Sequence, residues 1–468
     1  MEYWTKQKLD AIDKMLNPRS VAVVGATENA GYGNHFLNAV LRSRHRLRVY
    51  PVNPKYKQIN GVTCYPTVSD IPEPPDLVGV IVPSAHVLPT LRMSHAKGAR
   101  AAIVVSAGFA ESGTQTGIDL QRAIGEFARE SGLRVCGPNC LGVANVREGM
   151  WATATSHAPT DLAGRIGLVC QSGATAFGPF LRQAEDGGIG FSHIISTGNE
   201  ADLDFTDYAR YLLDDEGTRV VGGYVEGFRD VSKLVALAEV AAQRKKPLII
   251  IKIGRSEVGV RAALSHTATL TGSDRSYDAL FKQYGIIRAD DYSELLEVAS
   301  LLVDGKRPKQ RGIAVVSHSG GISSSAGDVF GQHHLSVPPL SEKAFAAIGK
   351  ILEGRGSAGN PADVTGRLAR SEQFPHIVDN MLNEPEVGTL VVASASTGTR
   401  TIQAEQVVAL HKRSEKRVTY LWVGSRFDDT GLTMLKRAGV PVFYSPTTMA
   451  RALQKAIEYE KWLDALPV

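Results

Sequence analysis

The stretch SVAVVGATENAGYG, residues 20–33, decides the fold class of this 468-residue chain. It begins with a short apolar run that ends in a glycine, and a helical pattern follows over residues 36–41. A buried strand that turns through glycines into a helix is the opening unit of a doubly wound domain. The sequence therefore predicts an α/β protein.

Further apolar runs follow the opening stretch. They are RVYPVN at 48–53, LVGVIVP at 77–83, AAIVVSA at 101–107 and LRVCGP at 133–138. Strands that are apolar almost throughout are covered on both faces, as in a parallel sheet flanked by helices. We therefore expect a first domain over residues 1–150 with a Rossmann-like sheet.

Two later stretches resemble each other. GRIGLVCQSGATA at 164–176 and RGIAVVSHSGGIS at 311–323 both read as a strand, a Ser-Gly pair and a helix start. Further matched landmarks are NEAD at 199–202 with NPAD at 360–363, and KPLIIIKIG at 246–254 with KRVTYLWVG at 416–424. This pattern indicates two related α/β domains, which we expect over residues 151–308 and 309–468.

Composition excludes several classes of protein. The net charge is +4 with interleaved signs, so no basic stripe for nucleic acid is expected. The N-terminus reads as an amphipathic helix without the apolar core of a signal peptide, and no apolar run reaches the roughly 20 residues of a membrane span. Four cysteines make no disulfide framework, and Cys136 and Cys140 lack a second ligand pair for zinc. We expect a cytoplasmic enzyme without a metal site, a nucleic-acid partner or a membrane partner.

The glycines after the first strand form a candidate phosphate-binding turn. Gly25, Gly31 and Gly33 are spaced G-x5-G-x-G, which differs from the G-x-G-x-x-G dinucleotide fingerprint. Glycines let backbone N–H groups approach a phosphate, and the following helix start favours negative charge. The alternative is a plain strand-to-helix turn. Lys55, in VNPKY, follows the second strand, at the edge of the sheet where ligands gather, and is a candidate ligand-binding residue. The alternative is that Lys55 is an ordinary solvated lysine.

The two Ser-Gly pairs predict helix N-caps at Ser172 and Ser319. Capping is also their ordinary structural explanation. A helix N-terminus carries roughly half a positive charge, so two such helix starts aimed at one point would hold a phosphate-sized dianion.

His266 lies in RAALSHTATLTGSD, residues 261–274, among small hydroxyl residues. No Cys, Glu or second His lies at ligand spacing, so a zinc site is poorly supported. A loop histidine and a general base remain alternatives. A neutral imidazole can also accept a phosphoryl group and pass it on, provided that its other ring nitrogen is held. Glu226 lies at the end of a predicted strand in GGYVEGFRD and could form the hydrogen bond that holds this second ring nitrogen. The alternative is that Glu226 is an ordinary surface carboxylate.

Together these motifs resemble the ADP-forming acyl-CoA synthetases, relatives of succinyl-CoA synthetase, over nearly the whole chain. The first domain is similar through SVAVVGAT, VNPKY, DIPEPPDL, VVSAGFAE and GPNCLGV. The second is similar through QSGA, TGNEADLDF, YVEG and SHTATLTGSD, and the third through SHSGG and GNPADVTG. The resemblance implies a Rossmann-like CoA-binding domain followed by two flavodoxin-like doubly wound parallel-sheet domains.

The resemblance also implies residue roles. His266 would be the phosphorylated histidine, and Glu226 would orient its ring as its catalytic partner. Phosphate would be held by Gln171, Ser172, Gly173, Ser319, Gly320 and Gly321. Coenzyme A would lie along Gly25, Ala26, Thr27, Asn53, Lys55, Val82, Pro83, Ser106 and Asn139. The histidine loop departs from the family's S-H-T-G-S-L-A-G, because Ala268, Thr269 and Thr271 replace Gly, Ser and Ala, which restricts the backbone.

The expected activity follows from the same resemblance. No ATP-grasp module is recognised, so the resemblance implies an α-type subunit whose β-type partner carries ATP or ADP and Mg²⁺ in an α2β2 assembly. The pair would convert a small carboxylic acid, CoA and ATP reversibly to acyl-CoA, ADP and phosphate through an acyl phosphate. The substrate acid is not specified by the sequence.

Two other classes are alternatives. A non-catalytic CoA or acyl-CoA-binding regulatory protein would have no use for the combination of His266, Glu226 and both Ser-Gly turns. A nicotinamide-dependent oxidoreductase is opposed by the missing fingerprint and by VNPK where an acidic residue should end the second strand.

Overall fold

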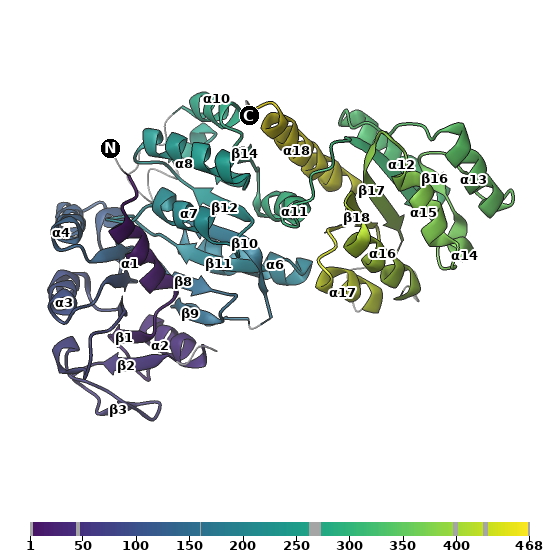
Figure 1. Ribbon diagram of the computed structural model, residues 1–468. Helices are drawn as coiled ribbons and strands as arrows, with labels where there is room; N and C mark the ends of the chain where they lie inside the picture. Colours follow the sequence, from purple (N-terminus) through teal and green to yellow (C-terminus); the bar gives the residue numbers. More distant parts are fainter. Residues whose placement is uncertain are drawn as a thin grey trace. The chain divides into compact units, whose positions relative to one another are not determined.

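The computed structural model describes residues 3–43, 47–159, 161–261, 273–395, 401–424 and 429–466. The chain divides into two compact units. The first comprises Met1–Gln183 and Gly190–Tyr292, and the second comprises Ala184–Ile189 and Ser293–Val468. Each unit is built on sheets that are mainly parallel, with helices on their faces (Figure 1), which confirms the predicted α/β class.

The first sheet of the first unit is parallel, with strand order β2-β1-β5-β6-β7. Its strands are β1 (Ser20–Val24), β2 (Arg48–Val52), β5 (Leu77–Val80), β6 (Ala101–Val104) and β7 (Arg134–Cys136). The remaining elements are α1 (Lys6–Leu16), α2 (Tyr32–Arg42), the hairpin β3 (Gln58–Ile59) and β4 (Val62–Thr63), 3₁₀ turns at Val68–Asp70 and Ala110–Ser112, α3 (Ser84–Ala96) and α4 (Gln115–Ser131). The strand order reverses between β1 and β5, and ligands of open parallel sheets bind at such a switch point.

The second sheet of the first unit has the order β14-β13-β12-β10-β11-β8-β9. Its strands are β8 (Gly142–Asn145), β9 (Met150–Thr153), β10 (Ala163–Cys170), β11 (Phe191–Ser196), β12 (Val220–Val225), β13 (Leu248–Lys252) and β14 (Ile287–Arg288). Its helices are α5 (Gly173–Thr175), a π-helical turn (Ala176–Phe180), α6 (Leu181–Gly187), α7 (Phe205–Asp214), α8 (Val231–Arg244) and α10 (Asp274–Gln283).

The structure differs from the predicted domain boundary at residue 150. Strands β8 and β9 form a buried antiparallel hairpin on each side of that position, and β8 pairs antiparallel with β11. The division between the two sheets therefore lies before Gly142. Helix α2 of the first sheet packs on β9, so the two sheets share one compact unit.

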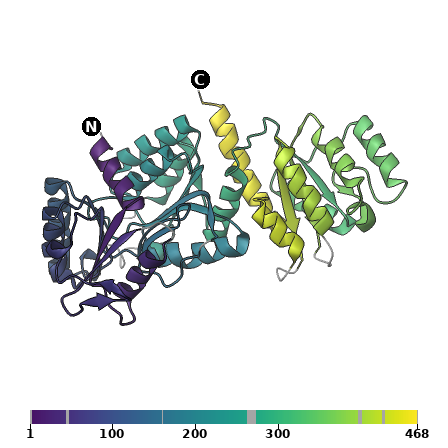
Figure 2. The same cartoon turned by 60° about the horizontal axis from the view of Figure 1, so that its bottom comes forward.

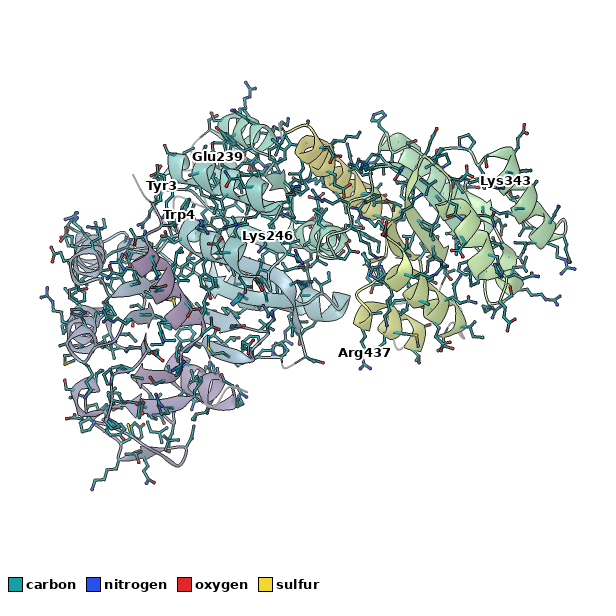
Figure 3. The ribbon with its side chains drawn as sticks, in the orientation of Figure 1. Tyr3, Trp4, Glu239, Lys246, Lys343 and Arg437 are labelled. Carbon is teal, nitrogen blue, oxygen red and sulfur yellow. The ribbon has the colours of Figure 1, made fainter. Side chains whose placement is uncertain are left out.

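Helix α1 joins the two sheets of the first unit. The Thr5 side chain caps it by accepting from the backbone N–H of Lys8, and its apolar side is buried. Lys8 pairs with Asp207 of α7 at 3.2 Å. Figure 3 labels Tyr3 and Trp4 at the start of this helix, where the guanidinium of Arg210 in α7 lies 5.8 Å from the Trp4 ring centroid. The predicted N-terminal amphipathic helix is therefore present and is part of the core.

The second unit has a parallel sheet with the order β16-β15-β17-β18-β19. Figure 2 shows helices on both faces of this sheet. Its elements are α11 (Tyr292–Leu302), β15 (Gly312–Ser317), α12 (Gly320–Gln332), α13 (Glu342–Leu352), β16 (Ala362–Asp363), α14 (Thr365–Leu368), α15 (Phe374–Leu382), β17 (Val387–Ser394), α16 (Thr401–Arg413), β18 (Arg417–Trp422), α17 (Thr430–Arg437), β19 (Val442–Phe443) and α18 (Pro446–Asp464).

The predicted repeat appears in the topology. Strands β10 to β14 have the order β14-β13-β12-β10-β11, and β15 to β19 repeat it as β19-β18-β17-β15-β16. This is the flavodoxin-like order 2-1-3-4-5. The boundary predicted between 308 and 309 differs from the structure, because α11 groups with the second unit. There Glu294 of α11 pairs with Lys455 of α18 at 2.7 Å.

In the described part of the chain, no helix is long and apolar enough to cross a membrane. The four cysteines of this part of the chain are buried free thiols, and it contains no group of three or more metal-ligating side chains.

Candidate active site

The glycine turn after β1 stands at the switch point of the first sheet. Gly25 has a φ of +93°, and its N–H donates to the carbonyl of Val52 at 3.0 Å. A Cβ added at Gly25 would lie 2.0 Å from the carbonyl oxygen of Ile81. Only glycine fits this position, because both the backbone conformation and the space exclude a side chain.

Asn53 ties the glycine turn to the loop after β2. Its side-chain nitrogen donates to the carbonyl of Ala26 at 2.8 Å, and its side-chain oxygen accepts from the N–H of Lys55 at 3.0 Å. The hydroxyls of Thr27 and Tyr56 lie 3.2 Å apart. The structure therefore brings together the predicted CoA residues that follow β1 and β2, with the Lys55 side chain exposed to solvent.

The other predicted CoA residues gather at the carboxyl ends of β5, β6 and β7. The Ser106 hydroxyl accepts from the N–H of Val82 at 3.1 Å and donates to its carbonyl at 2.5 Å. Asn139 has a φ of +57°, and its N–H donates to the carbonyl of Ser106 at 2.9 Å. Pro83 follows Val82 and precedes helix α3.

A cavity of about 570 Å³ in the first unit connects these residues with the second sheet. Its lining comprises Tyr32, Ile81, Val82, Pro83, Val105, Ser106, Ala107, Asn139, Cys140, Leu141, Gln171, Ser172, Gly173, Ala174, Gly198, Asn199 and Glu226. One cavity is therefore lined by residues from three predicted sets: those that bind CoA, those that bind phosphate, and the one that orients the histidine. Gly25, Ala26, Thr27, Asn53 and Lys55 are not part of its lining and lie at the ends of β1 and β2.

A helix begins at the wall of this cavity. Ser172 is its N-cap, with its hydroxyl accepting from the N–H of Thr175 at 3.4 Å. A Cβ at Gly173 would lie 2.8 Å from the Leu141 side chain and 2.9 Å from the Ser196 hydroxyl, so a small residue is required there. The helical run continues through residues 173–187. Its free N–H groups and partial positive charge favour an anion in the cavity.

Gln171 holds the backbone that carries Glu226. Its side-chain oxygen accepts from the N–H of Glu226 at 2.6 Å. Its side-chain nitrogen donates to the carbonyl of Gly227 at 2.8 Å. Glu226 directly follows β12, as predicted, and it is 9% exposed. The backbone that carries the Glu226 carboxylate is thereby held at the edge of the cavity.

Glu200 is a buried carboxyl group that the sequence prediction missed. It has a φ of +55° and accepts from the side-chain nitrogen of Gln171 at 3.0 Å. Burial raises the pKa of Glu200 to about 7. Its neighbour Asn199 accepts from the side-chain nitrogen of Asn139 at 3.2 Å, which links the two sheets. The signal in the sequence was the NEAD landmark, which served to align the repeat and to support the family resemblance but assigned Glu200 no role.

Lys252 is a second missed residue. It ends β13 and is 2% exposed. Its ammonium donates to the carbonyl of Ile253 at 2.6 Å and lies 5.0 Å from the ring centroid of Tyr277. Burial lowers the pKa of Lys252 to about 8. A lysine at the end of the apolar run LIIIK, on the ligand edge of the sheet, was the available signal.

The second Ser-Gly pair lies in the second unit. Ser319 stands at the N-cap of α12 with extended backbone, but its hydroxyl makes no capping bond, so the predicted cap is wrong in this respect. Its N–H instead donates to the hydroxyl of Ser317 at 3.2 Å. Gly320 and Gly321 form the first turn of the helix. His266 lies within residues 262–272, outside the described residues.

Comparison with known families matches two parts of the chain. A family described as "CoA binding domain" matches residues 19–146. A family described as "Succinyl-CoA ligase like flavodoxin domain" matches residues 163–302.

Whole-chain comparisons extend these matches. The alpha subunit of acetate–CoA ligase (ADP-forming) II of Pyrococcus furiosus is 31% identical, over 96% of this chain and 98% of the relative. Acetate–CoA ligase (ADP-forming) I of Archaeoglobus fulgidus is 34% identical, and this chain spans 64% of its length. A solved structure of the dinucleotide-forming acetyl-coenzyme A synthetase 1 of Ca. Korarchaeum cryptofilum, in complex with phosphate and ADP, is 29% identical. It matches with a TM-score of 0.88 over 98% of this chain and 99% of that chain.

The chain therefore contains a CoA-binding domain followed by a flavodoxin domain of the succinyl-CoA ligase type. The chain belongs to the ADP-forming acyl-CoA synthetase family and corresponds in extent to an alpha subunit of that family. This confirms the family that the motifs indicated.

Proposed function

We propose that this chain is the α-type subunit of an ADP-forming acid–CoA ligase that converts a carboxylate, CoA and ATP reversibly to acyl-CoA, ADP and phosphate. One observation carries the proposal. A single cavity is lined by Ser106 and Asn139 from the CoA-binding sheet, and by Ser172 and Glu226 from the ligase sheet.

The reaction divides one difficult acyl transfer into three easier steps. A ring nitrogen of His266 takes the γ-phosphoryl group of ATP, and ADP leaves. A carboxylate oxygen of the substrate then attacks phosphorus, the N–P bond breaks, and neutral imidazole returns. The CoA sulfur finally attacks the carbonyl carbon of the acyl phosphate, which releases phosphate. The thiol proton passes to solvent or to the departing phosphate.

The chain's own residues have distinct tasks in this scheme. The helix that begins at Ser172 stabilises negative charge on the phosphoryl group through its free N–H groups. Glu226 accepts a hydrogen bond from the second ring nitrogen of His266, which fixes the tautomer. Gly25 keeps the turn after β1, along which CoA lies in this proposal, packed against the Ile81 carbonyl, where a side chain would not fit.

The nucleotide and Mg²⁺ belong to a separate ATP-grasp β-type subunit in this proposal, in an α2β2 assembly. Support comes from the match to nearly the whole of an alpha subunit, whose name implies a partner. In this proposal the second of the two phosphate-binding helix starts is formed by Ser319, Gly320 and Gly321. The substrate is a small carboxylic acid.

The test is phosphorylation of the chain itself. It is mixed with a purified ATP-grasp subunit from the same genome, Mg²⁺ and γ-labelled ATP, beside His266→Ala. We expect acid-labile, base-stable label in the wild type and none in the variant. Absence of label while CoA still binds would overturn the proposal in favour of a CoA-binding regulatory protein.

A further inference from the structure

The side-chain amide of Gln171 has one orientation that satisfies its neighbours. Its oxygen faces the backbone N–H groups of Glu226 and Gly227, at 2.6 and 3.3 Å. Its nitrogen faces the carbonyl of Gly227 at 2.8 Å and a carboxylate oxygen of Glu200 at 3.0 Å. The turned amide would place donor against donor and acceptor against acceptor. Gln171 therefore clamps the turn that carries Glu226.

Glu200 supplies the far side of this clamp. Its carboxyl group is buried, with the residue 4% exposed. One oxygen accepts from the Thr197 hydroxyl and from the N–H of Phe205, both at 2.9 Å, and the other accepts from Gln171. An ionised carboxylate accepts at every position, whereas a neutral acid must donate at one oxygen. Three converging donors therefore match the ionised form, and its charge strengthens each bond.

We propose that Glu200 is a positioning residue of the ligase reaction, which fixes the amide of Gln171 and through it the position of Glu226. This inference rests on the proposed function, in which Glu226 orients His266. Glu200 is not in the lining of the cavity, so it acts through Gln171 rather than by touching substrate.

Ionisation of Glu200 links this clamp to pH. Burial and the neighbouring charge of Asp204 raise the pKa of Glu200, and Arg229 opposes them. Asp204 itself pairs with Lys233 at 2.8 Å. A proton on the oxygen that faces Gln171 would meet the amide nitrogen, donor against donor, and release the amide to turn. Phosphotransfer is therefore expected to fall as the pH drops through about 7.

The competing explanation is that Glu200 only stabilises its loop. A matched control separates the two, because Asp202 is a buried carboxylate two residues away. Asp202 accepts from Arg134 at 3.0 Å and from the N–H of Val135 at 2.9 Å, and does not contact Gln171. Glu200→Gln and Asp202→Asn each replace a buried carboxylate by an amide of the same shape.

The experiment compares wild type, Glu200→Gln and Asp202→Asn by two measurements. The first is the rate of phosphotransfer with the ATP-grasp subunit between pH 6 and 9, with CoA affinity measured alongside. The second is hydrogen–deuterium exchange of the peptide over residues 222–230, corrected for the intrinsic effect of pH, which needs no activity.

We expect Glu200→Gln to slow phosphotransfer at pH 8 by about 10- to 100-fold, the effect of one charge-assisted hydrogen bond. The fall in its phosphotransfer rate below about pH 7, the acid limb of the pH profile, should disappear. Its CoA affinity should stay unchanged, and the backbone amides of residues 222–230 should exchange hydrogen for deuterium faster. Asp202→Asn should keep the acid limb. The inference would be overturned if Glu200→Gln had the same hydrogen–deuterium exchange and the same acid limb as the wild type. Absence of phosphotransfer in the wild type would instead overturn the proposed function, and the exchange data would still decide whether Glu200 holds the clamp.

Discussion

Lys252 stands directly opposite Val225 in the parallel pair formed by β12 and β13, one residue before Glu226 on the neighbouring strand. Its ammonium is buried against the Tyr277 ring and donates a hydrogen bond to the carbonyl of Ile253. Burial lowers its pKa to about 8, although the charges of Asp274 and Glu226 oppose the shift. A cation is thus retained beside the candidate site at a cost in stability, as is common where function requires the charge.

Replacing Lys252 by Met removes the buried charge and preserves the length of the side chain. We expect the first unit to be more stable at pH 7 by up to about 3 kcal/mol, at about 1.4 kcal/mol per pKa unit. The folded pKa of about 8 lies below the reference value of 10.5. The folded state therefore binds fewer protons between these values, and wild-type stability rises with pH across that window. Urea unfolding of both proteins at pH 7 and pH 10 measures this, and a variant that is less stable at pH 7 would contradict it.

His193 in β11 predicts a second pH dependence. Neither ring nitrogen has a hydrogen-bond partner among the described residues, and burial lowers its pKa to about 4 from 6.5. The unfolded chain therefore takes up this proton first as the pH falls. The free energy of unfolding should therefore fall by up to about 3 kcal/mol through His193 as the pH drops from 6.5 to 4.

His193→Phe keeps a ring against Tyr211 and cannot titrate. Unfolding free energies of wild type and variant should diverge progressively below pH 6.5, with the variant losing less. The exposed His86→Gln is the control, and its pH profile should follow the wild type. Parallel profiles for wild type and His193→Phe would show that His193 does not stay neutral in the fold.

Gly25 predicts a steric effect at the CoA turn. An alanine Cβ would lie 2.0 Å from the Ile81 carbonyl oxygen, at a φ of +93° that alanine rarely adopts. Gly25→Ala should destabilise the first unit by about 2 kcal/mol or more and weaken CoA binding. Gly178→Ala is the matched control, since a Cβ there meets nothing within 4 Å. Thermal unfolding and CoA titration check both variants, and equal effects would refute the steric argument.

Local sequence patterns predicted the parallel strands and the residues that follow them. Apolar runs that end in glycine identified the parallel strands, and the positions after β1, β2, β5 and β12 identified residues at the ligand edge. The boundary between the first two domains was predicted at residue 150 rather than before Gly142, because the pairing of β8 with β11, about 50 residues later in the chain, was not predicted. Pairing at that distance is decided by tertiary packing, which the pattern of two short strands does not reveal.

Glu200 and Lys252 were missed for the same reason. Glu200 reads as a polar loop residue, and its role depends on Gln171, which precedes it in another loop. Lys252 reads as a solvated lysine at a strand end, until Tyr277 of α10 covers it. Burial of a charge is created by elements distant in sequence, so it becomes visible only in the folded chain.

The second unit contains a buried ion pair between Arg417 of β18 and Glu460 of α18, and each side chain is 1% exposed. Glu460→Gln would leave the Arg417 guanidinium buried without its charge partner. We expect the second unit to lose about 3–5 kcal/mol. The exposed pair of Arg413 and Asp379 is the control, and Asp379→Asn should cost less than about 1 kcal/mol.

The two units should respond separately to this change. Every residue that lines the cavity belongs to the first unit, so CoA binding to Glu460→Gln should match the wild type at temperatures where the first unit is folded. Differential scanning calorimetry with CoA titration measures both effects. Replacing Arg417 and Glu460 together by Met should recover much of the loss, because the fully buried Arg417 guanidinium is then removed with its partner, while Arg311, 3.6 Å from Glu460, keeps its ion pair with Asp464. If the double variant were as unstable as Glu460→Gln, the loss would come from packing rather than from the uncompensated charge.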